Sequence, residues 1–115
     1  MEQRDNAPVC PDWVENLGKR FWSKVAPQLH RDGILNAKTA DLFASACQAY
    51  AVYRHAVQVL KEEGRVITTN SGTVKTHPMM SVEKQAFEML CRVFKELGIA
   101  NKPVVEVADA LEAFN

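Results

Sequence analysis

Apolar side chains recur every three or four positions over most of this chain, which is the spacing of one face of an α-helix. The first such stretch begins at Pro11, and Asp32 with Gly33 ends it. Its stripe consists of Trp13, Leu17, Phe21, Val25 and Leu29. Pro27 falls inside the pattern, so we expect this helix to kink or break near residues 24–25.

The longest helical pattern follows, with Asn36 as its expected N-cap and Gly64 as the glycine that ends it. Its apolar positions are Leu42, Phe43, Ala46, Ala49, Tyr50, Tyr53, Val57 and Leu60. A third helix is predicted to start after His77, because Pro78 is tolerated in a first helical turn, and to end before Gly98.

The stretch between the second and third helices changes from helical to β-branched composition. Residues 66–69 and 73–76 are rich in valine and threonine, and Asn70-Ser71-Gly72 separates them. This pattern predicts a small hairpin at about residues 65–77, with a flexible loop as the alternative. An isolated hairpin is marginal in water, so we expect it to pack on a helix or pair with a neighbouring subunit.

The fold class predicted from these patterns is mainly α, with about four helices and the β-hairpin between helices 2 and 3. Residues 1–10 are predicted to be a flexible N-terminal arm, residues 11–98 a helical core, and residues 103–115 a C-terminal helical segment. The 115 residues, of which 47% are hydrophobic, suit one compact domain. A chain this short often gains stability by forming oligomers.

The formal charge is zero overall but is distributed unevenly. Residues 1–102 hold 14 basic and 11 acidic residues. The charged residues of the remaining segment are all acidic, namely Glu106, Asp109 and Glu112. This asymmetry predicts two surfaces with different partners, or alternatively an ordinary solvated helix face. The basic residues of the first forty positions that could meet phosphates are Lys19, Arg20, Lys24, Arg31 and Lys38. A scattered solubilising surface explains them equally well on one subunit, whereas repetition around a ring would give a continuous positive band.

No group of residues has the spacing of a catalytic or metal site. The three histidines lie in different predicted elements, and the isolated glycines form no phosphate-binding loop. Cys10, Cys47 and Cys91 are too widely spaced for a zinc knuckle or a disulfide framework, which favours a reducing compartment. We therefore expect no enzymatic activity, no cofactor and no metal. The chain has no signal-peptide pattern and no membrane-length apolar run, so we expect a cytoplasmic protein without a membrane partner.

Several short motifs occur in a characteristic order along residues 11–100. They are Pro11-Asp12-Trp13, Phe21-Trp22, Val25–Leu29, Asp32–Leu35, Cys47–Tyr53, Thr69–Thr73, Lys75–Pro78 and Glu96–Ile99. In this order they resemble the small subunits of tailed-phage terminases, in their short helical form. The sequence departs from that family after Gly98, where a proline and then a serine–arginine pair usually start the last helix. Here residues 99–104 intervene and the arginine is missing.

The resemblance implies a non-enzymatic protein of the host-cell cytoplasm that forms a homo-oligomeric ring. Such subunits bind double-stranded viral DNA and recruit or regulate the large subunit, which holds the ATPase and nuclease used in genome packaging. The second and third helices have wide apolar faces, so the expected oligomer interface includes Tyr50, Tyr53, Val57, Phe87 and Phe94. Alternatively, these faces pack together within one chain. The acids of residues 103–115 are the expected contact for the large subunit.

Three other functions remain open at this stage. The Asp32–Gly33 break between two helices is compatible with a helix-turn-helix regulator of transcription. A recognition helix, however, needs several polar or basic side chains at its start to contact base edges, and Lys38 and Thr39 are too few. A phage head–tail connector component is also small, helical and ring-forming. A nuclease partner is disfavoured because no metal-ligand cluster is visible.

Overall fold

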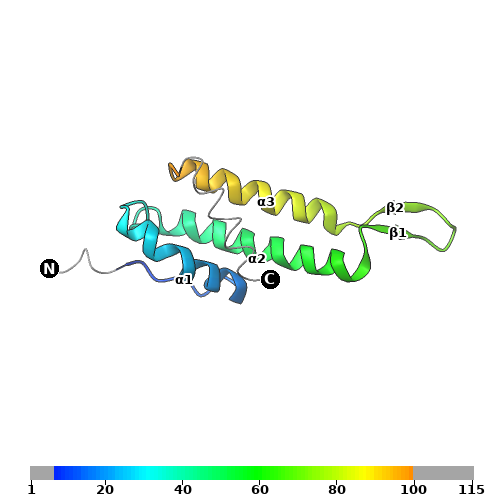
Figure 1. Ribbon diagram of the computed structural model, residues 1–115, viewed down its shortest axis with the longest axis horizontal. Helices are drawn as coiled ribbons and strands as arrows, with labels where there is room; N and C mark the ends of the chain where they lie inside the picture. The colour runs from blue at the N-terminus through cyan, green and yellow to red at the C-terminus, as the bar shows by residue number, and fades with distance from the viewer. Residues whose placement is uncertain (1–6, 100–115) are drawn as a thin grey trace.

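The computed structural model describes residues 7–99, and this range contains three helices and one antiparallel hairpin. The elements are α1 (Asn16–Arg31), α2 (Ala40–Glu63), β1 (Val66–Thr68), β2 (Val74–Thr76) and α3 (Met79–Glu96). Helix α2 lies between α1 and α3, and the hairpin projects from the end of the α2–α3 pair (Figure 1). The mainly helical fold and the position of the hairpin are confirmed. The predicted fourth helix, within residues 103–115, lies outside the described residues.

Helix α1 begins later than the apolar pattern predicted, at Asn16. The side chain of Gln48 fixes Glu15, the residue that precedes the helix. Its Oε1 accepts a hydrogen bond from the Glu15 backbone N–H at 2.9 Å, and its Nε2 donates to the Glu15 carboxylate at 2.9 Å. Glu15 is consequently extended. Trp13 therefore precedes the helix and is 56% exposed, whereas Val14 takes the buried position.

The sequence predicted a kink or a break before Pro27; helix α1 is continuous through this residue, so it does not break there. Proline removes the hydrogen bond to the carbonyl four residues earlier, which belongs to Ser23. Both residues are on the exposed side of the helix. Solvent can therefore hydrate the Ser23 carbonyl, and the helix continues at little cost.

The observed start of α2 differs from the one predicted from the sequence, whereas the observed end agrees with the prediction. Asn36 Oδ1 accepts hydrogen bonds from the backbone N–H groups of Lys38 and Thr39, at 2.8 and 3.2 Å. It therefore caps a turn ahead of the helix, which itself begins at Ala40. At the other end the prediction is confirmed, because Gly64 ends α2 with a φ of 86°.

An aromatic cluster joins all three helices at the end of the molecule distant from the hairpin. The ring of Phe21 lies 4.4 Å from that of Tyr50, 6.5 Å from Phe43 and 6.3 Å from Phe94, between centroids. Trp22 also packs on Phe43, at 4.9 Å. These rings come from α1, α2 and α3, so their burial holds α1 on the pair formed by the other two helices.

Gly18 permits a close approach between α1 and α2. A Cβ atom at this position would lie 2.6 Å from the carbonyl oxygen of Cys47, a distance that atoms do not tolerate. The Val14 side chain, 2.5 Å away, could turn aside, but the Cys47 carbonyl belongs to the backbone of the neighbouring helix and cannot. Only glycine therefore fits here without separating the two helices.

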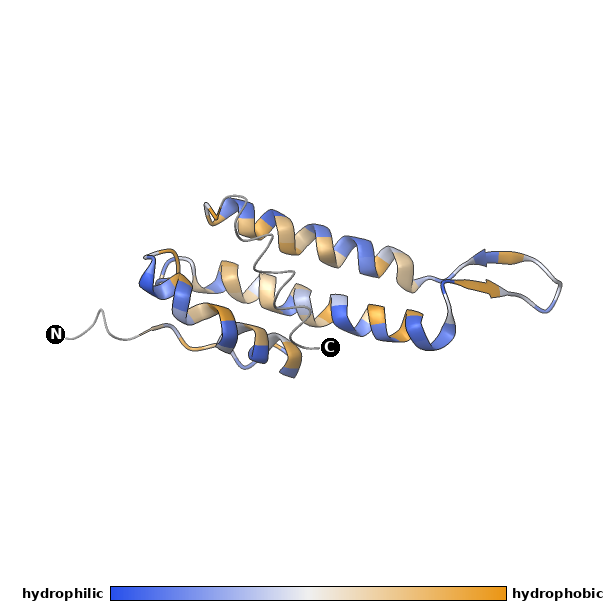
Figure 2. Cartoon of the chain, in the orientation of Figure 1, coloured by the Kyte–Doolittle hydropathy of each residue, from blue (hydrophilic) through white to orange (hydrophobic). Residues whose placement is uncertain are grey.

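The part of the helix pair nearest the hairpin is here called the neck: residues 52–63 of α2 and 79–89 of α3. Ala56, Leu60 and Ala86 are buried between its two helices. Figure 1 shows α1 alongside the other half of α2, so among the described residues the neck is built from two helices instead of three. Figure 2 shows that apolar residues nevertheless continue along the neck and into the strands.

Candidate functional site

Helix α1 carries a basic outer face. Its sequence contains four Lys or Arg residues and no Asp or Glu. Arg20, Lys24 and Arg31 are spaced by four and seven positions, so they lie along one line of the helix. The buried residues of α1 lie on the opposite side, and all three bases are exposed. These three residues are called the α1 basic face below.

The other two predicted DNA contacts lie off this face. The ammonium of Lys19 is partly buried and donates a hydrogen bond to the carbonyl of Pro11 at 2.9 Å, so it holds the segment before α1 in place. Lys38 is exposed in the turn before α2. The structure therefore brings three of the five predicted bases onto one line of α1. Lys19 shares a shallow hollow with Arg20 and Lys24, and Lys38 lies outside the helix.

A further polar hollow lies where the start of α1 meets α2. Arg54, His55 and Gln58 line it from α2, and Asn16 lines it from α1. The Arg54 Nε is buried and has no hydrogen-bond partner among the described residues. The sequence alone did not predict this hollow, because it depends on where α1 begins.

Tyr50, one turn before Arg54 on α2, is buried in the core. Burial raises the pKa of the Tyr50 hydroxyl, and the positive charges of Arg54 and Arg20 partly oppose that rise. Tyr50 is fully buried and Phe94 is 6% exposed. These two members of the predicted oligomer interface therefore pack within one chain.

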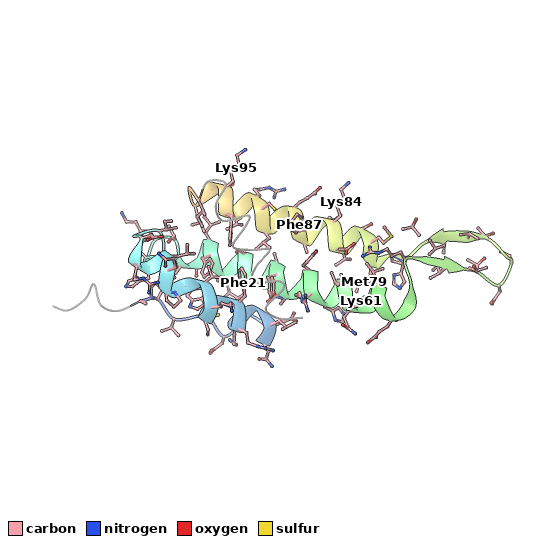
Figure 3. All side chains as sticks on the ribbon, viewed as in Figure 1. Phe21, Lys61, Met79, Lys84, Phe87 and Lys95 are labelled. Atoms are coloured by element: carbon pink, nitrogen blue, oxygen red, sulfur yellow. The ribbon has the colours of Figure 1, made fainter. Side chains whose placement is uncertain are left out.

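The other three members of that predicted interface reach the surface of the neck together. Tyr53 and Phe87 pack ring against ring, with centroids 5.5 Å apart, and Phe87 is 38% exposed. Val57 lies one turn from Tyr53 on the same side of α2 and is partly exposed. Tyr53, Val57 and Phe87 are called the Phe87 side. In Figure 3, Phe87 lies on α3 closer to the hairpin than Phe21, which belongs to the aromatic cluster of the three helices.

A second apolar surface, which sequence reasoning missed, lies on another side of the same helix pair. A groove of about 380 Å³ runs between α2 and α3, and its main apolar lining comes from Trp13, Val52, Val82, Ala86 and Met89. Trp13 borders it only because it precedes α1. Met89 is two residues from Phe87, which turns the two side chains about 200° apart around α3. This groove is called the Met89 side.

The base of the hairpin is tied to α3 by an ion pair. Arg65, just before β1, donates two hydrogen bonds to the carboxylate of Glu83 in α3, at 2.8 and 3.2 Å. These bonds lower the pKa of the Glu83 carboxyl below its usual value. The pairing therefore fixes the direction in which the hairpin leaves the neck.

His77, just after β2, ties the hairpin to both neck helices. Its Nδ1 accepts a hydrogen bond from the backbone N–H of Met79 at 3.0 Å, which caps the start of α3. An Nδ1 that accepts carries no proton, so Nε2 carries it and donates to the Glu63 carboxylate at 2.8 Å. Only 9% of His77 is exposed. Its two ring nitrogens thus join the ends of α2 and α3.

The described residues contain no other concentration of reactive groups. No cluster of three or more His, Cys, Asp or Glu in residues 7–99 is arranged to hold a metal ion. Burial raises the pKa of the Cys47 thiol, which keeps it protonated and unreactive. None of the helices in this range is long and apolar enough to cross a membrane. The predicted partner contacts Glu106, Asp109 and Glu112 lie outside the described residues.

Comparison with known proteins agrees with the order of motifs along the chain. No curated protein and no solved structure matches it. The family described as phage terminase, small subunit, matches residues 18–108, which include α1 from its third residue onward, the hairpin, α2 and α3. Because this match spans most of the chain, the protein belongs to the phage terminase small subunits.

Proposed function

We propose that this small subunit binds double-stranded viral DNA through the α1 basic face while assembled as a ring, and that it recruits the large subunit for genome packaging. The observation that carries the DNA contact is the charge of α1, whose exposed bases are not balanced by any acid in the helix. The subunit acts by binding and not by catalysis, and it needs no cofactor.

Electrostatics supports assembly as a requirement for DNA binding. One subunit offers three aligned charges, which would bind a duplex weakly at physiological salt. In a ring the same charges are repeated at regular spacing. Several subunits can then contact one duplex, and their linked contacts raise the overall affinity without any new residue.

The two apolar sides of the neck support a head-to-tail ring. The Phe87 side and the Met89 side are different surfaces, so the Met89 side of one subunit can pack on the Phe87 side of the next. An interface between two unlike surfaces repeats around an axis and closes into a ring when the rotation permits. Each subunit would thereby cover both of its exposed apolar surfaces.

The C-terminal acids remain the proposed contact for the large subunit. Glu106, Asp109 and Glu112 form a segment without bases, unlike the basic α1. Removing residues 103–115 is expected to leave DNA binding intact and to reduce stimulation of the large-subunit ATPase. Full stimulation by the truncated ring would show that the large subunit binds elsewhere.

The position of α2 argues against a helix-turn-helix regulator. A recognition helix must present its first turns to the major groove. Here Phe43 and Ala44, near the start of α2, are completely buried, and α2 is the central helix of the three. A head–tail connector remains distinguishable by experiment, because it would form a ring that ignores free duplex DNA.

The decisive experiment compares two triple variants with the same change in charge. In one, Arg20, Lys24 and Arg31 are replaced by Ala. In the other, three exposed lysines of α2 and α3 labelled in Figure 3 are replaced by Ala: Lys61, Lys84 and Lys95. Duplex affinity is measured at several salt concentrations, and native mass spectrometry verifies that both variants form the same oligomer.

The first variant should bind DNA more weakly, and the slope of log affinity against log salt should flatten by about 0.9 for each phosphate that the protein no longer neutralises. The control should keep the wild-type slope, since only its net charge has changed. Equal reductions in affinity for both variants would show that net charge, and not the α1 basic face, determines binding. A ring that binds no DNA at any salt concentration would favour the connector.

A further inference from the structure

The groove of the Met89 side is open and apolar in a single subunit. Its volume is about 380 Å³, and none of its lining side chains is charged. Trp13 and Met89 in its lining are 56% and 38% exposed, whereas Ala49 and Ala86 are buried. Apolar surface in water is unfavourable, so the groove suits a partner whose contact face is apolar and uncharged.

The end of α3 turns the chain back toward the helices. The Gly98 N–H donates to the Lys95 carbonyl at 3.0 Å, and the Ile99 N–H donates to the Phe94 carbonyl at 3.2 Å. Gly98 has a φ of 79°, so these two bonds form the Schellman motif that ends many helices. Ile99 packs against the core. The chain therefore leaves the described range in contact with the helices.

The sequence that follows has one apolar side and one acidic side. Residues 103–115 are here called the tail, and their sequence predicts a helix. Helical spacing would align its apolar residues along one stripe: Val104, Val107, Ala108, Leu111 and Phe114. The acids Glu106, Asp109 and Glu112 would lie on the opposite side. Such a helix presents an uncharged stripe to a groove and keeps its acids in solvent.

The length of the tail agrees with the length of the groove. Because α3 rises about 1.5 Å per residue, Val82 lies about 21 Å from the end of that helix at Glu96. The tail as a helix would be about 20 Å long, and residues 100–102 can span about 10 Å as a linker. A tail that returns antiparallel to α3 would thus extend over the groove from Met89 to Val82.

Attachment to the same chain favours the tail over a separate partner. A segment on a short linker reaches its site at an effective concentration of millimolar order. A second subunit must reach the groove from free solution, where its concentration is much lower. The tail is therefore the favoured occupant of the groove in a single subunit.

We infer that the tail of each subunit docks as a helix in the Met89 side of its own chain, and that a neighbouring subunit displaces it during assembly. The displacement rests on the ring of the proposed function, whereas docking in a single subunit does not. A closed ring links many interfaces, which favours the neighbour over the tail. The released tail then exposes its apolar stripe as well as its acids, so the large subunit can distinguish an assembled ring from a single subunit.

Quenching of tryptophan fluorescence by acrylamide tests docking in the full-length chain. Phe87→Asp, at concentrations low enough to prevent assembly, supplies the single subunit. The chain has two tryptophans, and Trp22 is only 5% exposed, so Trp13 in the groove dominates the quenching. Trp13→Phe measures the contribution of Trp22, which is subtracted.

Two tail variants with the same change in charge are compared in that background. Leu111→Asp places its charge within the apolar stripe, whereas Val105→Asp places it on the acidic side. Leu111→Asp should increase Trp13 quenching several-fold, to the level of a chain without residues 103–115, and Val105→Asp should leave it unchanged. Equal quenching in the parent and in Leu111→Asp would overturn docking, as would an equal increase in both variants.

The same two variants with Phe87 restored test displacement by the neighbour. A tail that occupies the groove about nine-tenths of the time lowers the apparent affinity of the neighbour about tenfold. Native mass spectrometry should therefore detect rings of Leu111→Asp at about tenfold lower concentration than rings of Val105→Asp. Rings that form at the same concentration would overturn the competition. Absence of rings in both variants would overturn the displacement together with the proposed ring, while the quenching result would still decide docking.

Cleavage after Glu106 by a glutamate-specific protease reports the position of the tail directly. It should be about tenfold faster in the wild-type ring than in the single subunit made by Phe87→Asp, because cleavage follows the exposed fraction of the segment. Tails that are cut equally slowly in both would show that the neighbour leaves them docked, and would overturn the displacement.

Discussion

The two ends of this molecule bury their apolar residues to different extents. At the end formed by three helices, the rings of Phe21, Phe43 and Tyr50 are completely buried within one chain. At the end formed by the neck and hairpin, two helices and two short strands leave Phe87, Val66 and Val74 exposed. Both ends have β-branched or aromatic residues at regular spacing, so the amino-acid composition of the two ends does not explain why one is buried and the other exposed.

The presence of a third helix at one end decides which apolar surface remains exposed. Helix α1 covers one half of α2 and closes the core there, while its outer face carries the basic residues. The neck receives no such cover from the described residues. One end therefore buries its apolar residues within one chain and carries the proposed DNA contact, while the other leaves apolar surface exposed for the proposed contacts between subunits.

The largest expected effect is a loss of stability on Phe21→Ala. Phe21 contacts rings from both other helices, so its removal leaves a cavity and should cost about 3–5 kcal/mol of the free energy of unfolding. Urea denaturation of the Phe87→Asp background, at concentrations low enough to prevent assembly, measures this without contributions from the oligomer. A cost below that of Met89→Ala in the same background would contradict the assigned core.

Gly18→Ala should come next, with a cost of about 1–3 kcal/mol. The added methyl group would meet the Cys47 carbonyl oxygen, so α1 must move away from α2. Labelling of the Cys47 thiol by a small reagent reports that movement, because this residue is completely buried in the native protein. Exposed Cys91 is the internal control and should react at the same rate in both proteins. Unchanged Cys47 labelling and stability would show that the helices are not held this closely.

At the other end, Phe87→Asp should leave the fold stable and weaken assembly by about 10- to 30-fold, as expected for a central aromatic residue of an interface. Met89→Asp should do the same from the opposite surface. Each variant keeps one intact side, so an equimolar mixture should form dimers of one copy of each in native mass spectrometry. A mixture that restores no association would exclude head-to-tail packing of these two surfaces.

The smallest effect is expected at the hairpin base. The folded protein lowers the pKa of Glu83, so its ion pair stabilises the fold above the ordinary carboxyl pKa and this contribution is lost as pH falls through the lowered value. Glu83→Gln should therefore give slightly lower thermal stability at neutral pH and a weaker loss on acidification. Glu88→Gln, an exposed carboxyl on the same helix, is the control. Parallel acid profiles for wild type and Glu83→Gln would rule out this contribution.

Local signals in the sequence were enough to locate most elements but not every boundary. Gly64 and the β-branched residues around Asn70-Ser71-Gly72 act through the backbone of their own segment, and both were predicted correctly. The start of α1 was not, because Gln48, more than thirty positions away, holds Glu15 extended. The effect of Pro27 was misjudged because it depends on which side of the helix faces solvent.

Some features of the candidate surfaces likewise follow from local spacing, and others depend on how the helices pack. Helical periodicity is local, so the alignment of Arg20, Lys24 and Arg31 along α1 follows from their spacing alone, as does the position of the valines and threonines of the hairpin. The packing of the helices, in contrast, makes Tyr50 and Phe94 core residues, brings Tyr53 and Phe87 to the surface, and places Trp13 beside the Met89 side. The apolar faces of α2 and α3 are wider than the contact between these two helices, so the position of α1 decides which part of them is left exposed.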